Sequence, residues 1–291
     1  MKIITSIFNQ LSLENKKYHV LTFSSTYHQM EFRDLLRRYF RNRKGKTDSR
    51  YLYLVDYDGR ELKHNEVYFI NFNCSITNLS QDKTTEKQLK EMLYFFLENH
   101  PEFVEEYMQF NKQLEQFLSS IKFEKENLLV DFLPSSRTVK QLINSLDIEI
   151  EYEEERYVPN YVLRHYLIEL LLSLNESNKP PLLFLVYPES DVGHEDFSIV
   201  IEKTKSLGIT TLVLTAEKEF ITAAKAERMF LVQSNGELYD VEEVRDELIS
   251  LNYVKEEHVD KIAKEIAYYD FRKQYEHLNS KLKKFIVSSK L

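Results

Sequence analysis

The chain of 291 residues exceeds the roughly 100 to 200 residues of one domain, so its length predicts two compact parts. Hydrophobic residues make up 43% and charged residues 30% of the chain, a composition of folded globular proteins that excludes a disordered or fibrous chain. The formal net charge is -8 and Cys74 is the one cysteine, which excludes an internal disulfide and a cysteine-based metal cluster.

The beginning of the chain, MKIITSIFNQLSLE, mixes apolar and polar residues and has no small-residue cleavage site, which indicates a first strand and not a signal peptide. The longest apolar stretch, residues 161–174, is interrupted by Arg164, His165 and Glu169. It falls short of the ~20 apolar residues that a membrane helix needs. We therefore expect a cytoplasmic protein that makes no membrane contact.

Residues 18–23, YHVLTF, predict a strand that leads through the loop SSTYH into a helix from about Gln29 to Arg41. A phosphate-binding loop at this place needs glycine, because backbone N–H groups must approach the phosphate. The loop has no glycine, and the nearest similar sequence, Gly45-Lys46-Thr47, follows the helix instead of preceding it. We therefore expect no nucleotide hydrolysis and no other enzymatic activity.

The predicted helix at residues 29–41 combines an apolar face with a positively charged flank. Arg33, Arg37 and Arg41 recur every fourth residue beside the apolar positions. Against three acidic residues, the segment from Glu31 to Arg50 holds eight basic ones: Arg33, Arg37, Arg38, Arg41, Arg43, Lys44, Lys46 and Arg50. This density with interleaved aromatics predicts phosphate contacts. A solvated helix face, with Asp34 paired to Arg38, is the alternative.

Residues 51–73 predict two strands, YLYLVDYDGREL and VYFINFN, around a turn at Asp58-Gly59. From Thr84 to Leu146 the hydrophobic period becomes helical, without strands. After Pro101, apolar residues spaced alternately by four and three predict a coiled-coil-like seam. The seam residues are Phe103, Tyr107, Phe110, Leu114, Phe117 and Ile121.

A run of acidic residues follows this helical segment. Glu149, Glu151 and Glu153 alternate along a predicted strand and would share one face. Such a face suits a calcium site, a salt-bridged subunit contact or a plain solvated edge strand.

The second half of the chain predicts a parallel sheet. Residues 181–187, 209–215 and 229–233 are continuous apolar strands, with helices at 159–174 and about 195–206 between them. Glu189 follows the first of these strands, as a catalytic glutamate of a nucleotide hydrolase would, but a buried strand entering a polar turn has the same pattern. Residues 241–291 predict two more helices, and the last contains Lys281, Lys283 and Lys284.

Several of these segments, in order, resemble a family of DNA-end-binding adaptation proteins encoded by type II-A CRISPR loci. The resemblance covers roughly residues 51–233, and its most specific parts are RTVKQLINSLDIEIE, the helix ending LLLSLN, PPLLFLVYPES and ITTLVLTAEKEF. It implies an α/β head related to P-loop ATPase domains without a working phosphate loop, and an inserted helical leg. The implied bounds are 1–78 with 147–235 for the head, 79–146 for the leg and 236–291 for a C-terminal helical extension.

The resemblance also implies a non-catalytic, homotetrameric ring that encloses linear double-stranded DNA without sequence preference. Its implied partners are the CRISPR integrase proteins and effector nuclease during spacer acquisition, and calcium is its implied cofactor. Short family members carry an acidic run before the helix that corresponds to residues 138–146, where this chain keeps Asp131. Asp131 is thus the implied metal ligand, and Lys281, Lys283 and Lys284 could extend the DNA contact.

Two other functions stay open at the sequence level. One is a diverged P-loop-type nucleotide hydrolase with a helical insertion, and the other is a protein-interaction scaffold without DNA binding.

Overall fold

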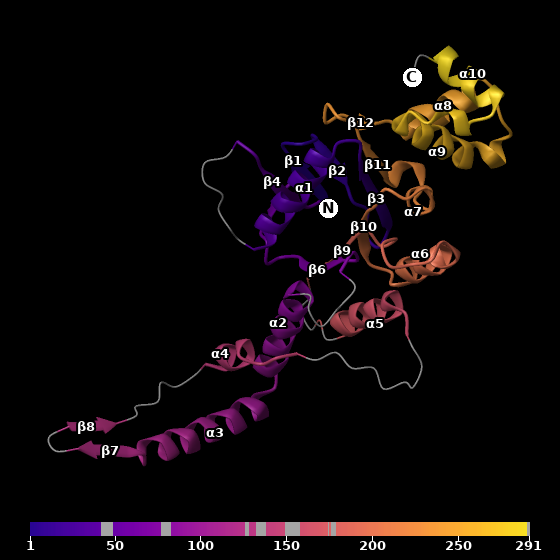
Figure 1. Ribbon diagram of the computed structural model, residues 1–291. Helices are drawn as coiled ribbons and strands as arrows, with labels where there is room; N and C mark the ends of the chain where they lie inside the picture. Colours follow the sequence, from indigo (N-terminus) through magenta and orange to yellow (C-terminus); the bar gives the residue numbers. More distant parts are fainter. Residues whose placement is uncertain are drawn as a thin grey trace. The chain divides into compact units, whose positions relative to one another are not determined.

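The computed structural model describes residues 1–41, 49–76, 83–125, 128–131, 138–148, 158–173, 175 and 179–289. Its contacts divide the chain into two compact units (Figure 1). The first unit comprises Met1–Thr77, Val158–Tyr166 and Ser177–Leu291, and the second comprises Asn78–Tyr157 and Leu167–Glu176. Among the helices within these ranges, none has both the length and the apolar character that crossing a membrane requires.

A six-stranded sheet organises the first unit. Its order is β12-β11-β3-β10-β9-β6, and all neighbouring strands run parallel except the pair of β11 and β12. The bounds are β3 Tyr18–Phe23, β6 Tyr68–Asn73, β9 Pro181–Val186, β10 Thr210–Leu214, β11 Met229–Val232 and β12 Leu238–Tyr239. The central strands are buried along their whole length, which is why their sequences are continuously apolar. The predicted α/β class with a mainly parallel sheet is confirmed.

A second, antiparallel sheet was not expected from the sequence. It has the order β2-β1-β4-β5 and consists of β1 Lys2–Thr5, β2 Gln10–Ser12, β4 Leu52–Val55 and β5 Glu61–Leu62. The turn at Asp58-Gly59 joins β4 to β5, and Asp56 Oδ1 accepts hydrogen bonds from the N–H groups of Asp58 and Arg60. The predicted hairpin of residues 51–73 is therefore wrong in its second arm, because β6 pairs with β9 in the other sheet.

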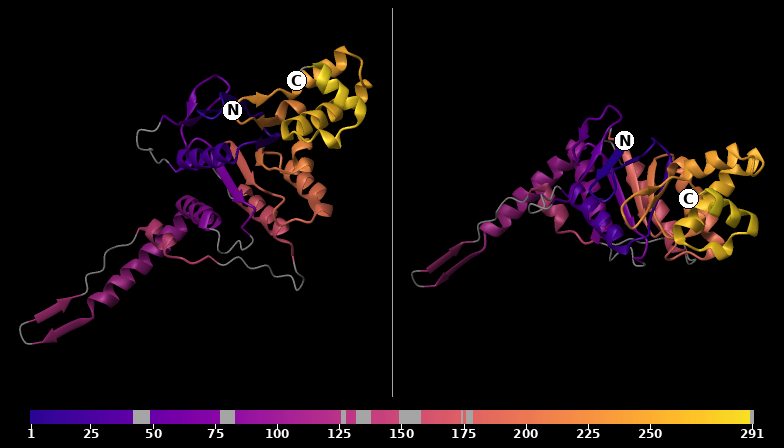
Figure 2. Two further views of the ribbon diagram at one scale, coloured as in Figure 1. Left: turned by 45° about the horizontal axis from the view of Figure 1, so that its top comes forward. Right: turned by 90° about the horizontal axis from the view of Figure 1, so that it is seen from above.

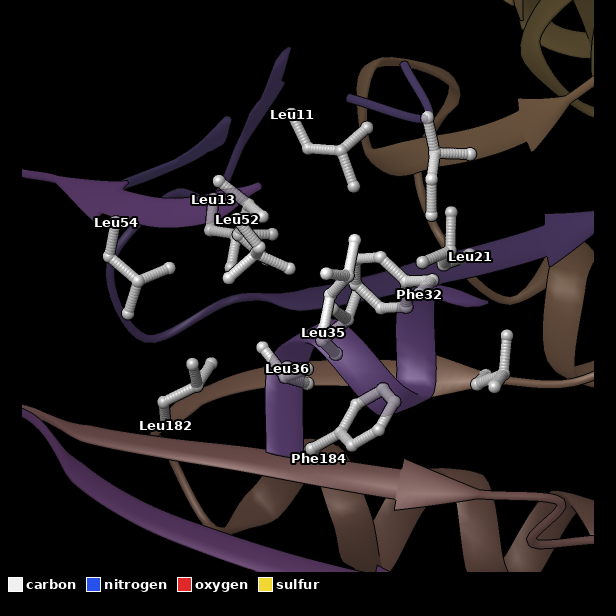
Figure 3. Packing of buried hydrophobic residues seen from close by; sticks show 14 of the residues in the cluster. Leu11, Leu13, Leu21, Phe32, Leu35, Leu36, Leu52, Leu54, Leu182 and Phe184 are labelled. Carbon is white, nitrogen blue, oxygen red and sulfur yellow. The ribbon is translucent and has the colours of Figure 1, made fainter. Parts of the chain in front are cut away.

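Helix α1, Thr26–Phe40, packs between these two sheets and fills the main hydrophobic core (Figure 3). Phe32 and Leu36 of α1 are fully buried, and the Phe32 ring lies 6.2 Å from that of Phe184 in β9. Leu21 of β3 and Leu54 of β4 close the core from the two sheets. One face of α1 is thus committed to packing, which leaves the other to solvent.

Short helices connect the later strands, and the C-terminal region forms a helical cluster beside β11 and β12 (Figure 2). The helices of this half are α5 Asn160–Ser173, α6 Phe197–Ser206, α7 Lys218–Thr222, α8 Val241–Ser250, α9 Glu256–Arg272 and α10 Ser280–Ser289. The prediction of two helices after residue 241 is wrong, because Asn252 and Lys273 adopt left-handed backbone angles that break the segment into three.

The second unit contains α2 Lys83–Asn99, α3 Pro101–Ser119, α4 Val139–Asn144 and an antiparallel pair, β7 Lys122–Lys125 with β8 Leu128–Asp131. Thr138 and Gln141 form a reciprocal capping box at the start of α4. The strands β7 and β8 correct the expectation that residues 84–146 hold helices alone. The strand predicted over the acidic run at 149–153 lies outside the described residues.

The chain leaves the first unit after β6 and returns to it at the start of α5. Arg164 of α5 forms hydrogen bonds with the segment that follows β6. Its guanidinium donates to the carbonyls of Cys74 (3.5 Å) and Ile76 (3.4 Å), where the chain departs. It also makes two 3.2 Å hydrogen bonds to the carboxylate of Asp191, and both side chains are buried. A buried ion pair with further carbonyl partners holds these segments together.

Candidate nucleic-acid interface

The N-terminal end of α1 lies at the carboxyl edge of the parallel sheet, where open α/β sheets bind their ligands. The Ser25 side chain caps α1 by accepting a hydrogen bond from the His28 N–H group at 3.4 Å. One turn further along α1, the Gln29 side chain donates to the hydroxyl of Tyr187, which follows β9 with a φ of 54°. Side chains therefore occupy the place where a glycine-rich loop would leave backbone N–H groups open.

Arg33, Arg37 and Arg41 share one flank of α1, as the spacing predicted. The Arg33 guanidinium lies 5.7 Å from the centroid of the Tyr187 ring, which keeps its charge at the carboxyl edge. Arg37 is half-buried, and Arg41 is exposed at the C-cap, where its N–H group donates to the carbonyl of Arg37 (3.0 Å). The flank thus presents a row of cations along about two turns.

Arg38 fits the alternative prediction for this helix, a solvated face on which Asp34 pairs with Arg38. It pairs with Asp34 at 2.6 Å across one turn, and both side chains are largely exposed. Such an exposed pair contributes about 0.3 to 0.5 kcal/mol of stability and offsets the local charge of Arg38. Arg38 thus has an acidic partner one turn away on the same helix.

Beyond the helix, the predicted contacts Arg43, Lys44 and Lys46 lie outside the described residues. Arg50, just after them, is 3.3 Å from the Glu31 carboxylate, and its guanidinium lies 5.8 Å from the Tyr27 ring. Tyr27 and Met30 expose 57% and 65% of their surface on α1. The exposure of these two side chains was not predicted, although their position on a polar turn of the helix is visible in the sequence.

The lysines of α10 form a separate group. Lys281 donates to the Tyr253 carbonyl (2.8 Å) and lies 4.7 Å from the Tyr253 ring, so it packs α10 onto its neighbours. Lys283 and Lys284 are exposed. In Figures 1 and 2, α10 lies beyond β11 and β12 from α1, so the lysines and the α1 arginines do not form one patch.

Asp131, the metal ligand implied by the resemblance, is the last residue of β8 and pairs in register with Lys122. Calcium takes six to eight oxygen ligands, typically from several carboxylates. No group of three or more His, Cys, Asp or Glu residues that could hold a metal occurs within the described ranges. Calcium binding by Asp131 thus stays a prediction from the resemblance.

Glu189 connects the loops after β9 and β10. Its Oε1 accepts a hydrogen bond from the Ala216 N–H group at 3.2 Å, and burial raises the pKa of its carboxyl group. This contact gives Glu189 a structural role, in agreement with the interpretation of residues 181–189 as a buried strand that enters a polar turn.

Comparison with known proteins places the fold. No protein-family model and no curated protein matches the sequence. Among solved structures, the chain is similar to the crystal structure of Stu0660 of Streptococcus thermophilus, with a TM-score of 0.55 and 12% identity. The match covers 95% of this chain and 94% of that chain. The two proteins therefore share a mixed α/β fold over nearly their whole lengths.

Proposed function

We propose that this chain is a non-catalytic protein that binds double-stranded DNA without sequence preference, as a homotetrameric ring in CRISPR spacer acquisition. The observation that carries the proposal is the row of Arg33, Arg37 and Arg41 on the flank of α1. The opposite face of this helix is buried, so the row has a fixed position, as phosphate contacts require. The sequence resemblance supplies the CRISPR context.

A ring explains how an acidic chain binds a polyanion. The net charge of -8 opposes binding of one subunit, but several identical copies would turn the same local patch toward one duplex. Each neutralised phosphate releases counterions, so the contributions of the copies add up. Contacts to phosphates alone carry no base information, which makes the binding independent of sequence.

The proposal includes a head related to P-loop ATPase domains, and the parallel sheet with α1 directly after its central strand β3 supports that relation. Ser25 and Gln29 occupy the place of a phosphate loop, which favours a non-catalytic head over the nucleotide-hydrolase alternative. The integrase proteins and the effector nuclease remain proposed partners. Calcium remains a proposed cofactor, and molecular mass in solution with and without calcium tests it.

The decisive variant reverses two charges of the row, Arg37→Glu with Arg41→Glu. We expect weaker binding to all duplex sequences alike and a smaller salt dependence, because the slope of log K against log salt falls by about 0.9 per lost phosphate contact. Filter binding with two unrelated linear duplexes over a salt series measures both effects.

The matched control is Arg245→Glu with Lys261→Glu, two exposed residues on α8 and α9. It changes the net charge of the chain by the same amount, so a loss of binding caused by overall charge would occur in both variants. An unchanged salt slope in the α1 variant contradicts the assignment of these arginines, and no binding by the wild-type chain contradicts the proposed function.

A further inference from the structure

Two exposed side chains continue the arginine row of α1 toward the beginning of the helix. Tyr27 and Met30 expose 57% and 65% of their surface. Met30 precedes Arg33 by three residues and Tyr27 precedes Met30 by three, a spacing that places all of them on one flank of the helix. Phe32 and Leu36 pack into the core from the other side of α1 (Figure 3). The outward flank of α1 therefore changes from cations to an aromatic ring and a thioether.

Neighbouring side chains hold the Tyr27 ring in place. The Arg50 guanidinium lies 5.8 Å from the centroid of the ring. Arg50 in turn is 3.3 Å from the carboxylate of Glu31, whose side chain is only 11% exposed. A ring that is fixed before binding loses little conformational entropy when a ligand stacks on it. Tyr27 thus offers a rigid aromatic surface to solvent.

The combination of an aromatic ring with a row of cations indicates the chemistry of the ligand. Proteins bind unpaired nucleotides in this way, because cations contact the phosphates while aromatic side chains stack on the bases. Within a duplex each base face is covered by the next base pair, so side chains reach only the base edges in the grooves. The polarizable sulfur of Met30 also packs favourably on aromatic rings. The ligand that fits Tyr27 and Met30 is therefore an unpaired base.

The distance between the ring and the cations matches a short single strand. Six residues separate Tyr27 from Arg33, which corresponds to about 9 Å along the helix axis. Nucleotides in a stacked strand advance by about 3.4 Å each, so about three of them span this distance. The continuity of Tyr27 and Met30 with the arginine row favours DNA over a partner protein as the occupant. A duplex held by the row would place an unpaired extension of one strand on these two side chains.

From this arrangement, we infer that Tyr27 and Met30 form a stacking platform for the unpaired bases of a DNA overhang. The chain then binds duplex ends that carry an overhang more tightly than blunt ends. This inference rests on the proposed contact of the arginine row with duplex phosphates. Every base has an aromatic face, so the platform adds no sequence preference.

Fluorescence anisotropy with linear duplexes of one sequence tests the stacking platform. The ends are blunt, or carry an overhang of about three nucleotides, or carry the same overhang with abasic sugars. Each overhang is made in both strand polarities. The abasic overhang has the same phosphates, so the comparison of the two overhangs measures the contribution of the bases alone. We expect the wild-type chain to bind the overhang with bases at least about fivefold more tightly in one polarity or both, with equal salt slopes.

Variants of Tyr27 assign this advantage to the ring. Tyr27→Ala should abolish it, whereas Tyr27→Phe should retain it, because a phenyl ring still stacks on a base. The matched control is Tyr57→Ala, which removes a tyrosine that is 63% exposed in the turn between β4 and β5 and should retain the advantage. Fluorescence of 2-aminopurine in the overhang gives a second measurement, because stacking quenches it. The chain has no tryptophan whose emission would interfere.

The same measurements distinguish the stacking platform from the arginine row. Arg37→Glu with Arg41→Glu should weaken binding to all these duplexes alike and leave the ratio between the two overhangs unchanged. Equal wild-type affinity for overhangs with and without bases, in both polarities, overturns the platform even if blunt duplex is bound. An advantage that survives Tyr27→Ala also overturns it, and Tyr27 and Met30 would then suit a partner protein. If the wild-type chain binds none of the duplexes, the platform and the proposed function are both wrong.

Discussion

At the scale of single residues, His19 shows how the sheet uses a polar side chain in a fully buried place. It lies in β3 with 0% of its surface exposed. Its Nε2 accepts a hydrogen bond from the Glu14 N–H group (2.9 Å), so Nδ1 carries the proton and faces the Thr211 carbonyl at 3.1 Å. The ring stacks on Phe230, with 6.1 Å between centroids. Both nitrogens are satisfied in the neutral form, and a second proton has no acceptor.

Burial accordingly lowers the pKa of His19 from 6.5 to about 4. Between these two pKa values, His19 binds a proton in the unfolded chain but not in the folded chain. The stability from neutral His19 is fully present above pH 6.5 and is lost as pH falls toward 4. The loss is about 1.4 kcal/mol per pH unit and about 3 kcal/mol in total. Urea unfolding between pH 7 and pH 4 should show this extra slope in the wild-type chain compared with His19→Gln.

His258→Gln serves as the control, because this histidine is 60% exposed on α9. Equal slopes for the wild-type chain and His19→Gln would contradict the account of His19 as a neutral, buried residue.

At the scale of elements, two glycines with the same φ differ in how closely other backbone atoms approach them, so their substitution distinguishes backbone strain from a steric clash. Gly59 and Gly236 both have a φ of 85°. A Cβ at Gly59 would meet nothing within 4 Å, whereas a Cβ at Gly236 would lie 2.3 Å from the Ile7 carbonyl oxygen. Gly236 belongs to the turn between β11 and β12, and Ile7 to the segment between β1 and β2. The closeness of these two turns therefore depends on the missing side chain.

We expect Gly59→Ala to lower the free energy of unfolding by about 1 to 2 kcal/mol, the cost of a left-handed alanine. Gly236→Ala should cost more, since the backbone of Ile7 or of the turn must also move. Thermal unfolding of both variants measures the difference. Equal losses would mean that the two turns separate without cost.

The elements also show what a sequence pattern can and cannot determine. The order of α1 and of β3, β9, β10 and β11 follows from apolar runs and caps that are local in the chain. The assignment of β4 and β5 to one sheet and β6 to another does not, because β6 pairs with β9 more than a hundred residues later. The contact of Arg33 with Tyr187 escaped for the same reason. Periodicity places a residue on a face and leaves the partner of that face open.

At the scale of the whole molecule, the second unit is an insertion that leaves the sheet of the first unit unchanged. It enters between β6 and β9, which are neighbours in the sheet with continuous register from Tyr68 and Pro181 onward. Arg164 ties the departing segment at Cys74 and Ile76 to the returning helix. A chain of this design can change the inserted unit without rearranging the strands that carry α1 and its arginines.

At the same scale, the proposed closed ring can be distinguished from an open binding surface by how the protein leaves the DNA. A ring loaded on linear duplex DNA can leave only over an end, so blocking both ends with a bulky protein after loading should trap it. We expect the trapped complex to survive a salt challenge at least tenfold longer than the complex on open ends, because salt weakens phosphate contacts but not enclosure. Gel electrophoresis of samples taken during the challenge measures both lifetimes.

The order of addition provides the control for this experiment. When the ends are blocked before the protein is added, a closed ring cannot load, so the long-lived complex should be absent, as it should be on a covalently closed circle of the same sequence. If the ring opens to load, blocking the ends before adding the protein will not prevent binding. The lifetime of the trapped complex will then equal the time that the ring takes to open. Equal lifetimes on blocked and open ends would exclude enclosure, because only a protein that encircles the duplex must leave over an end. The α1 arginines would then form an open electrostatic binding surface.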